Sequence, residues 1–191
     1  AMKPTVTAIT NIEYDHPDFF KSEDEVRESF LRAINLSEEL AVLPADDKNA
    51  RALMPSVSVP FITVGCGSAD YEYSINSILR TGLELSLRHK GKEQKIKLSL
   101  IGSHNAANAA LAASAALELG IESKYINEAL ADFKAPSRRL ERVGEYRGRE
   151  VLYDYAHHPT EISAAISALR AWGEGEITVI FKPHTYTRTR A

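Results

Sequence analysis

Two polar clusters in the last quarter of the chain carry side chains that could bind an anionic substrate. The first, residues 154–159, contains one carboxylate and two adjacent histidines, His157 and His158. The second, residues 182–190, contains a lysine, a histidine and two arginines. Pro159 is well suited to the first position of a helix, so the two histidines should project from a tight, rigid turn. Imidazole and cationic groups in this combination favour a phosphate or carboxylate ligand.

Each cluster directly follows a short apolar run. Residues 150–153 precede the first cluster and residues 177–180 precede the second, and Ile162, Ile166 and Leu169 repeat at helical spacing between them. This pattern predicts a strand, a helix and a strand, and such a crossover makes the two strands parallel. Open α/β sheets bind ligands at the carboxyl ends of their strands. We therefore expect both clusters to converge at one sheet edge.

A second candidate site lies at the start of an alanine-rich helix that we expect over residues 103–119. Asn105 and Asn108 are one helical turn apart, and His104 is beside them. The unpaired N–H groups and the positive dipole end of a first turn favour anions. Asn amides also pair with the donor and acceptor edges of a nucleobase. The alternative interpretation is that Ser103 or Asn105 only caps the helix.

Asp15 and His16 follow a strand predicted over residues 4–10, with Glu13 two residues before them. A carboxylate and an imidazole in this position could bind a divalent cation. The alternative is an ordinary polar loop, which these residues taken by themselves favour.

Arg138 and Arg139 lie at an expected boundary between two domains, residues 1–137 and 138–191. A guanidinium there could reach a bound phosphate, or it could be a solvated linker charge. Asp154 stands just past a strand end, where carboxylates bind ribose hydroxyls in α/β nucleotide folds. The alternative for Asp154 is that it caps the following helix.

The whole chain is expected to be α/β. One helix is predicted to begin at Ser22, and others over residues 46–53, 103–119 and 123–133. Strands are predicted over residues 4–10, 40–43 and 59–64. An antiparallel meander is expected to follow over residues 71–100, with a turn at Lys90-Gly91.

Composition limits the function classes. The chain has 191 residues, 44% of them apolar, and a net charge of −3, which argues against a nucleic-acid binder. No run of about eighteen apolar residues is present, so no membrane span is expected. The single cysteine, Cys66, is consistent with a reducing, cytoplasmic compartment and is expected to be a small buried residue.

Five segments together resemble the Mur ligase family, the ATP-dependent amide ligases of peptidoglycan synthesis. They occur in family order and span essentially the whole chain: residues 10–16, 103–110, 137–141, 154–161 and 183–190. The resemblance implies the later part of a central ATPase domain followed by the start of a Rossmann-like C-terminal domain with a βαβ unit.

The resemblance also implies a mechanism. ATP phosphorylates a substrate carboxylate, and the amine of an incoming amino acid attacks the acyl phosphate. The implied site residues are His16 for Mg²⁺; His104, Asn105, Asn108, Arg139 and Asp154 for ATP; and His157, His158, His184 and Arg188 for the amino acid and the muramoyl carboxylate.

The double histidine and the last segment most resemble the branch that joins L-alanine to UDP-N-acetylmuramate. The branch that recycles murein tripeptide shares residues 156–159 but differs over residues 184–190. An alternative from another class is a nucleotide-binding module without catalysis.

Family members also carry a Gly-rich UDP-binding domain and a Gly-x-x-x-x-Gly-Lys-Thr/Ser phosphate loop. This sequence contains neither, since Gly91-Lys92 lacks the earlier glycine and the following hydroxyl residue. We therefore expect the chain to be an internal fragment that is inactive by itself.

Overall fold

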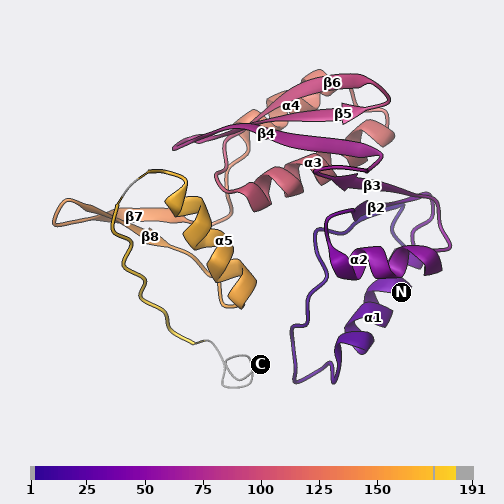
Figure 1. Ribbon diagram of the computed structural model, residues 1–191, viewed down its shortest axis with the longest axis horizontal. Coiled ribbons are helices and arrows are strands. Elements are labelled where there is room, and N and C mark those ends of the chain that lie inside the picture. Colours follow the sequence, from indigo (N-terminus) through magenta and orange to yellow (C-terminus); the bar gives the residue numbers. More distant parts are fainter. Residues whose placement is uncertain (1–2, 174, 184–191) are drawn as a thin grey trace.

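The computed structural model describes residues 3–173 and 175–183. Its main body is a mixed six-stranded sheet in the order β1-β2-β3-β4-β5-β6 (Figure 1). Neighbours from β1 to β4 are parallel, and β4, β5 and β6 form an antiparallel meander. This confirms the predicted α/β class and the meander. The strands are β1 (Val6–Ala8), β2 (Leu40–Pro44), β3 (Phe61–Gly65), β4 (Tyr71–Leu79), β5 (Gly82–His89) and β6 (Lys92–Leu98).

Helices cover both faces of the sheet. Strand β2 shows the layering, because its side chains alternate between faces. Val42 belongs to the core shared with α3 and α4, whereas Ala41 and Leu43 belong to the core shared with α1 and α2. The helices of this body are α1 (Glu23–Asn35), α2 (Lys48–Leu53), α3 (Ser103–Glu118) and α4 (Ser123–Asp132).

The meander is held by cross-strand apolar pairs on its buried face. Leu85 of β5 lies opposite Ile96 of β6, and neither side chain is exposed to solvent. The turn between these strands uses Lys90 and Gly91 with φ angles of 48° and 75°. Two consecutive positive φ values match the right-handed twist of a two-residue hairpin, as the sequence predicts.

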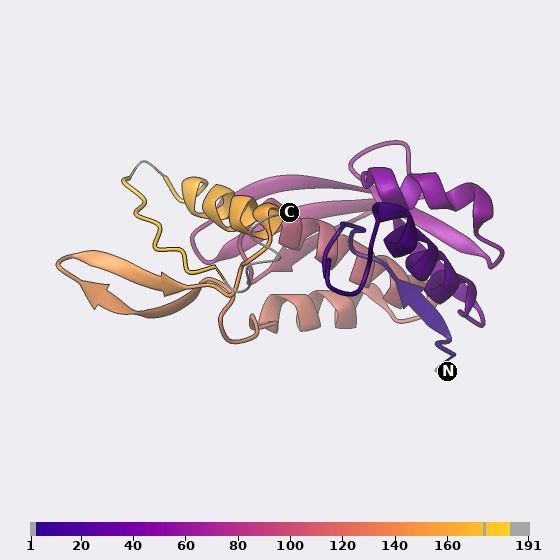
Figure 2. The same cartoon turned by 90° about the horizontal axis from the view of Figure 1, so that it is seen from below.

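A smaller unit follows the main body. Strands β7 (Glu141–Tyr146) and β8 (Arg149–Tyr153) form an antiparallel hairpin, and α5 (Pro159–Arg170) comes next. Figure 2 shows the hairpin extending away from the six-stranded sheet, while α5 lies beside the main body. Ala168 of α5 packs close to Gly102, at the start of α3.

The predicted strand over residues 177–180 is wrong. Residues 175–183 form neither helix nor strand, so the parallel βαβ pairing with β8 is not made. Parallel strands are stable when both faces are covered, but Val179 is 53% and Ile180 95% exposed. Because nothing covers these side chains, a strand here would bury little apolar surface.

The prediction that Cys66 is buried is also wrong. It is exposed, because it lies in the turn after β3 rather than in the strand. Its backbone N–H donates to Oδ2 of Asp46 at 2.8 Å, which fixes that turn against the end of β2.

Candidate active site

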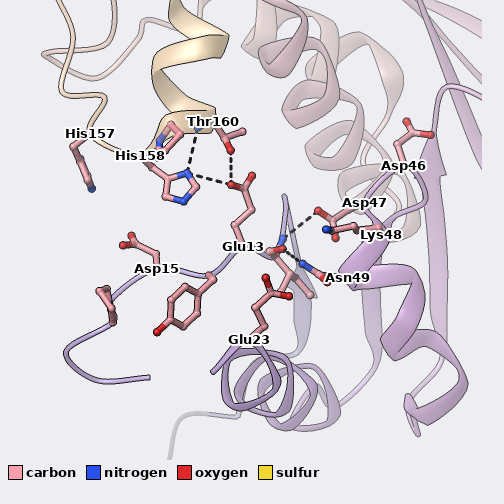
Figure 3. Close-up of a pocket in the computed structure, with 14 residues that line it drawn as sticks. Glu13, Asp15, Glu23, Asp46, Asp47, Lys48, Asn49, His157, His158 and Thr160 are labelled. Carbon is pink, nitrogen blue, oxygen red and sulfur yellow. Dashed lines mark hydrogen bonds and ion pairs between the residues drawn. The ribbon is translucent and has the colours of Figure 1, made fainter. Parts of the chain in front are cut away.

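A cavity of about 690 Å³ lies where the smaller unit meets the main body (Figure 3). Three segments form its walls: the loop before α1, the first turn of α2 and the turn before α5. Its lining residues are Ile12, Glu13, Tyr14, Asp15, Pro17, Glu23, Asp46, Asp47, Lys48, Asn49, His157, His158, Pro159 and Thr160.

The loop before α1 is fixed by the first turn of α2. Asp47 caps α2 by accepting from the Ala50 N–H at 2.7 Å, and its other oxygen accepts from the Ile12 N–H at 3.3 Å. Asn49 donates to the Ile12 carbonyl at 2.7 Å. Ile12 is only 1% exposed. Glu13, the next residue, therefore projects into the cavity from a firmly held backbone.

The histidine turn is braced by the helix that it starts. His158 is the N-cap of α5 and Pro159 follows at the first helical position. The Glu161 carboxylate accepts from the backbone N–H groups of His157 at 3.0 Å and His158 at 3.3 Å. This reciprocal capping satisfies donors that a helix start leaves unpaired. It also fixes the direction of both histidines.

Charge around Glu161 reinforces this brace. Partial burial by itself raises the pKa of the Glu161 carboxyl, but the N–H donors of His157 and His158, with the nearby His157 and Arg139 side chains, lower it below its usual range. Nη1 of Arg139 lies 3.5 Å from Oε1 of Glu161. Arg139 is therefore tied to the histidine turn through one carboxylate.

A second group of residues predicted to bind ATP converges beside α3. Loss of solvent lowers the pKa of His104, Asp154 partly offsets this effect and Arg139 adds to it. The three side chains are thus close enough to act on one another electrostatically. His104 folds back over Gly102, where a Cβ would lie 2.6 Å from its ring, and Gly102 has a φ of 93°. Only glycine fits this helix start without strain.

Comparisons with known proteins agree with this arrangement. Residues 1–116 match the Mur ligase middle domain, and residues 138–191 match the glutamate ligase domain of Mur ligases. The chain belongs to the Mur ligase family.

Among similar proteins are the UDP-N-acetylmuramate--L-alanine ligases of Caldicellulosiruptor bescii and Aquifex aeolicus, which are 36% and 37% identical over 98% of this chain. The chain spans 42% of the length of each of these Mur ligases. A MurF structure from Acinetobacter baumannii superposes with a TM-score of 0.80 at 23% identity, covering 91% of this chain and 38% of that one. UDP-N-acetylmuramate-alanine ligase MurC from Thermotoga maritima gives a TM-score of 0.75 at 25% identity, covering 89% of this chain and 39% of that one.

In this Mur ligase chain, helix capping does not explain the two asparagines. The N-cap of α3 is Gly102, with no side-chain cap, so the capping alternative is wrong. Asn105 instead donates its amide to the Ile101 carbonyl at 2.7 Å. Asn108 is exposed, and no hydrogen bond between described residues uses its amide. Asn105 therefore has a structural bond, whereas Asn108 faces solvent with its full hydrogen-bonding capacity.

Asp154 also has a structural role. Its two oxygens accept from the N–H groups of Leu140 at 2.8 Å and Ala156 at 2.7 Å. These bonds join the end of β8 to the segment before β7. The helix-capping alternative is wrong, because His158 is the N-cap. Each oxygen keeps a further lone pair that can accept a bond from a ribose hydroxyl. The ribose contact therefore stays a prediction.

His16 lies outside the cavity lining, and its side chain is 66% exposed. Its Nε2 is 3.7 Å from Oδ2 of Asp15. Within residues 3–173 and 175–183, no three carboxylate, imidazole or thiol groups converge as a metal cage. The donor chemistry at His16 fits a cation that keeps waters and takes other ligands from substrate phosphates.

The structure brings together most, but not all, of the predicted site residues. His157 and His158 reach the cavity, and His104, Arg139 and Asp154 gather beside it. His184 and Arg188 lie outside the described residues. The sequence did not point to Asp46, Asp47, Lys48, Asn49 and Thr160 as site residues. The two aspartates nevertheless come two and three residues after the end of a buried parallel strand, which is itself a signal of a site.

The brace at Glu161 predicts an effect of pH on stability. A carboxyl whose pKa is lowered on folding contributes stability above its usual pKa of 4.5, and the contribution is lost as the pH falls through the folded value. We therefore expect Glu161→Gln to lower the unfolding midpoint at neutral pH and to approach wild type near pH 3. Thermal unfolding across this range measures the difference. Glu28→Gln, at an exposed position of α1, is the control, and an equal gap at both pH values would contradict the prediction.

Proposed function

We propose that this chain is part of an ATP-dependent ligase that joins L-alanine to UDP-N-acetylmuramate in the cytoplasm. The observation that carries the proposal is the cavity itself. Its walls combine carboxylates from the part that matches the middle domain with histidines from the part that matches the glutamate ligase domain. The names of the similar curated ligases support the choice of L-alanine and UDP-N-acetylmuramate.

In the proposed reaction, the terminal phosphoryl group of ATP passes to an oxygen of the muramoyl carboxylate, and ADP leaves. The amine nitrogen of L-alanine then attacks the acyl carbon. A C–N bond forms, the C–O bond to phosphate breaks, and phosphate leaves with the bonding electrons. Such chemistry depends on positioning and on neutralised charge more than on a protein nucleophile.

The described residues have distinct parts in this reaction. Residues 1–137 belong to an ATP-binding domain and residues 138–191 to the ligase domain. Asn108 holds adenine, and Arg139 and Asp154 hold ribose or phosphate. His16 binds Mg²⁺, which supplies charge neutralisation at the phosphates when it is bound.

The test is phosphate release by the intact ligase with ATP, Mg²⁺, UDP-N-acetylmuramate and L-alanine. We expect release only when all are present. Release that depends on murein tripeptide instead of L-alanine would reassign the acceptor. ATP binding without any acceptor-dependent release would favour a nucleotide-binding module.

The two asparagines give a sharper prediction. Asn108→Ala should raise the KM for ATP, because it removes a directional hydrogen bond worth about 0.5–1.5 kcal/mol, and it should leave stability unchanged. Asn105→Ala should instead lower the unfolding midpoint, since it removes the bond to the Ile101 carbonyl. Steady-state kinetics and thermal unfolding of both variants separate the two effects. An unchanged KM in Asn108→Ala would overturn the adenine assignment.

A further inference from the structure

Glu13 connects the two parts of the cavity. Its Oε2 accepts from Oγ1 of Thr160 at 2.6 Å and lies 3.2 Å from Nδ1 of His158 (Figure 3). Its Oε1 accepts from the amide of Asn11 at 3.0 Å. The side chains of Glu13 and His158 are 29% and 25% exposed. The carboxylate is therefore aimed at the histidine turn by bonds on both of its oxygens.

Nδ1 of His158 has two competing partners. The Thr160 backbone N–H lies 3.3 Å away and requires a bare nitrogen, whereas Glu13 is an acceptor and requires Nδ1–H. One nitrogen cannot satisfy both. The bond to a carboxylate is the stronger, because it is assisted by charge. Contact with Glu13 thus selects the imidazole with its proton on Nδ1 and leaves Nε2 bare.

We propose that Glu13 is a positioning residue that sets the tautomer of His158, and that His158 accepts the proton of the attacking amine at Nε2. This rests on the proposed ligase activity. Figure 3 shows Nδ1 turned toward Glu13 and the other ring nitrogen turned away from it, into the cavity. Without Glu13, Nδ1 caps α5 and Nε2 carries the proton. His158 is then a hydrogen-bond donor and cannot act as a base.

Two protons leave the nitrogen of the amino acid. The ammonium group gives one to Nε2 of His158, and the freed lone pair forms the C–N bond; the second leaves with the departing phosphate, which becomes hydrogen phosphate as the C–O bond breaks. His158 becomes an imidazolium, which Glu13 stabilises across the 3.2 Å contact. The other charged groups of the cavity are Asp15 on the same loop, Glu23 on α1, and Asp46, Asp47 and Lys48 at the start of α2; His157 and Glu161 lie on the turn of His158 itself.

The contact between Glu13 and His158 makes the proton-accepting form of His158 depend on the docking of α5 against the main body. Glu13 precedes α1 and His158 precedes α5, and 145 positions separate them in the sequence. The pair exists only while α5 is docked on the main body. Docking therefore converts His158 from a helix cap into a proton acceptor when the cavity closes.

Histidine NMR of the 191-residue chain tests the tautomer without any assay of ligation. Two-bond ¹H–¹⁵N spectra should show the proton of His158 on Nδ1 in the wild type and on Nε2 in Glu13→Ala. Thr160→Val removes the other bond of the same carboxylate and should keep the proton on Nδ1. An Nε2–H tautomer in the wild type, or no change in Glu13→Ala, would overturn the proposal.

Kinetics of the intact ligase test the consequence. Glu13→Ala should lower kcat by about 10- to 100-fold, part of the 10²–10⁴ that a positioned base contributes, with the KM for ATP unchanged. Glu28→Gln on α1 should match wild type. A tautomer change without a fall in kcat would refute the role of His158 as base. A wild-type enzyme that does not ligate would refute the proposed function and leave the NMR result intact.

Discussion

The chain of 191 residues by itself should show no ATP-dependent ligation. Its sequence contains no Gly-x-x-x-x-Gly-Lys-Thr/Ser loop, so the β- and γ-phosphates lack the backbone cradle and lysine that position them for transfer. Positioning accounts for about 7–11 kcal/mol of a barrier in favourable cases, and its loss should abolish turnover. The measurement is phosphate release with UDP-N-acetylmuramate, L-alanine, ATP and Mg²⁺.

The intact ligase at the same concentration is the positive control. Nucleotide binding, measured by calorimetry, should persist weakly in the chain, because His104 and Asn108 lie one turn apart on α3 and Arg139 is close enough to His104 to act on its pKa. Turnover above background from the purified chain would mean that another segment performs the task of the phosphate loop.

Local pattern was enough to predict the main body. The alternation of leucines in β5 and the turn at Lys90-Gly91 depend on residues close in sequence, and the structure confirms both. The alanine face of α3 packs tightly against the sheet, as its composition indicates. In these segments, burial pattern and turn chemistry point to the same structure.

Contacts between distant segments could not be predicted in this way. No local pattern relates Glu13 to Thr160, and their bond forms only when two separately folded parts meet. The capping of α5 was also missed, because histidine is not a favoured N-cap residue and Asp154 offered a better one. The run at residues 177–180 has strand propensity, but tertiary cover decides whether such a run becomes a strand.

Replacing His158 should have the largest effect of any single change in the cavity. The residue has two tasks: it occupies the N-cap position of α5, and in our proposal its Nε2 accepts a proton while Nδ1 is bound to Glu13. His158→Asn separates them, because asparagine is among the best N-cap residues but cannot take a proton. We expect this variant to keep the unfolding midpoint of the wild type and to lose about 10²- to 10⁴-fold in kcat.

His158→Ala is the matched comparison. It should lose a similar factor in kcat and, compared with His158→Asn, about 0.5–2 kcal/mol of stability, because alanine cannot cap α5. If His158→Asn retained turnover, the imidazole would serve only the helix, and the base would have to be sought elsewhere in the cavity. If both variants lost stability and activity together, the loss of turnover would trace to the collapse of the turn that Glu161 braces. Measuring kcat and unfolding on the same preparations therefore decides whether His158 is a proton acceptor or only a cap.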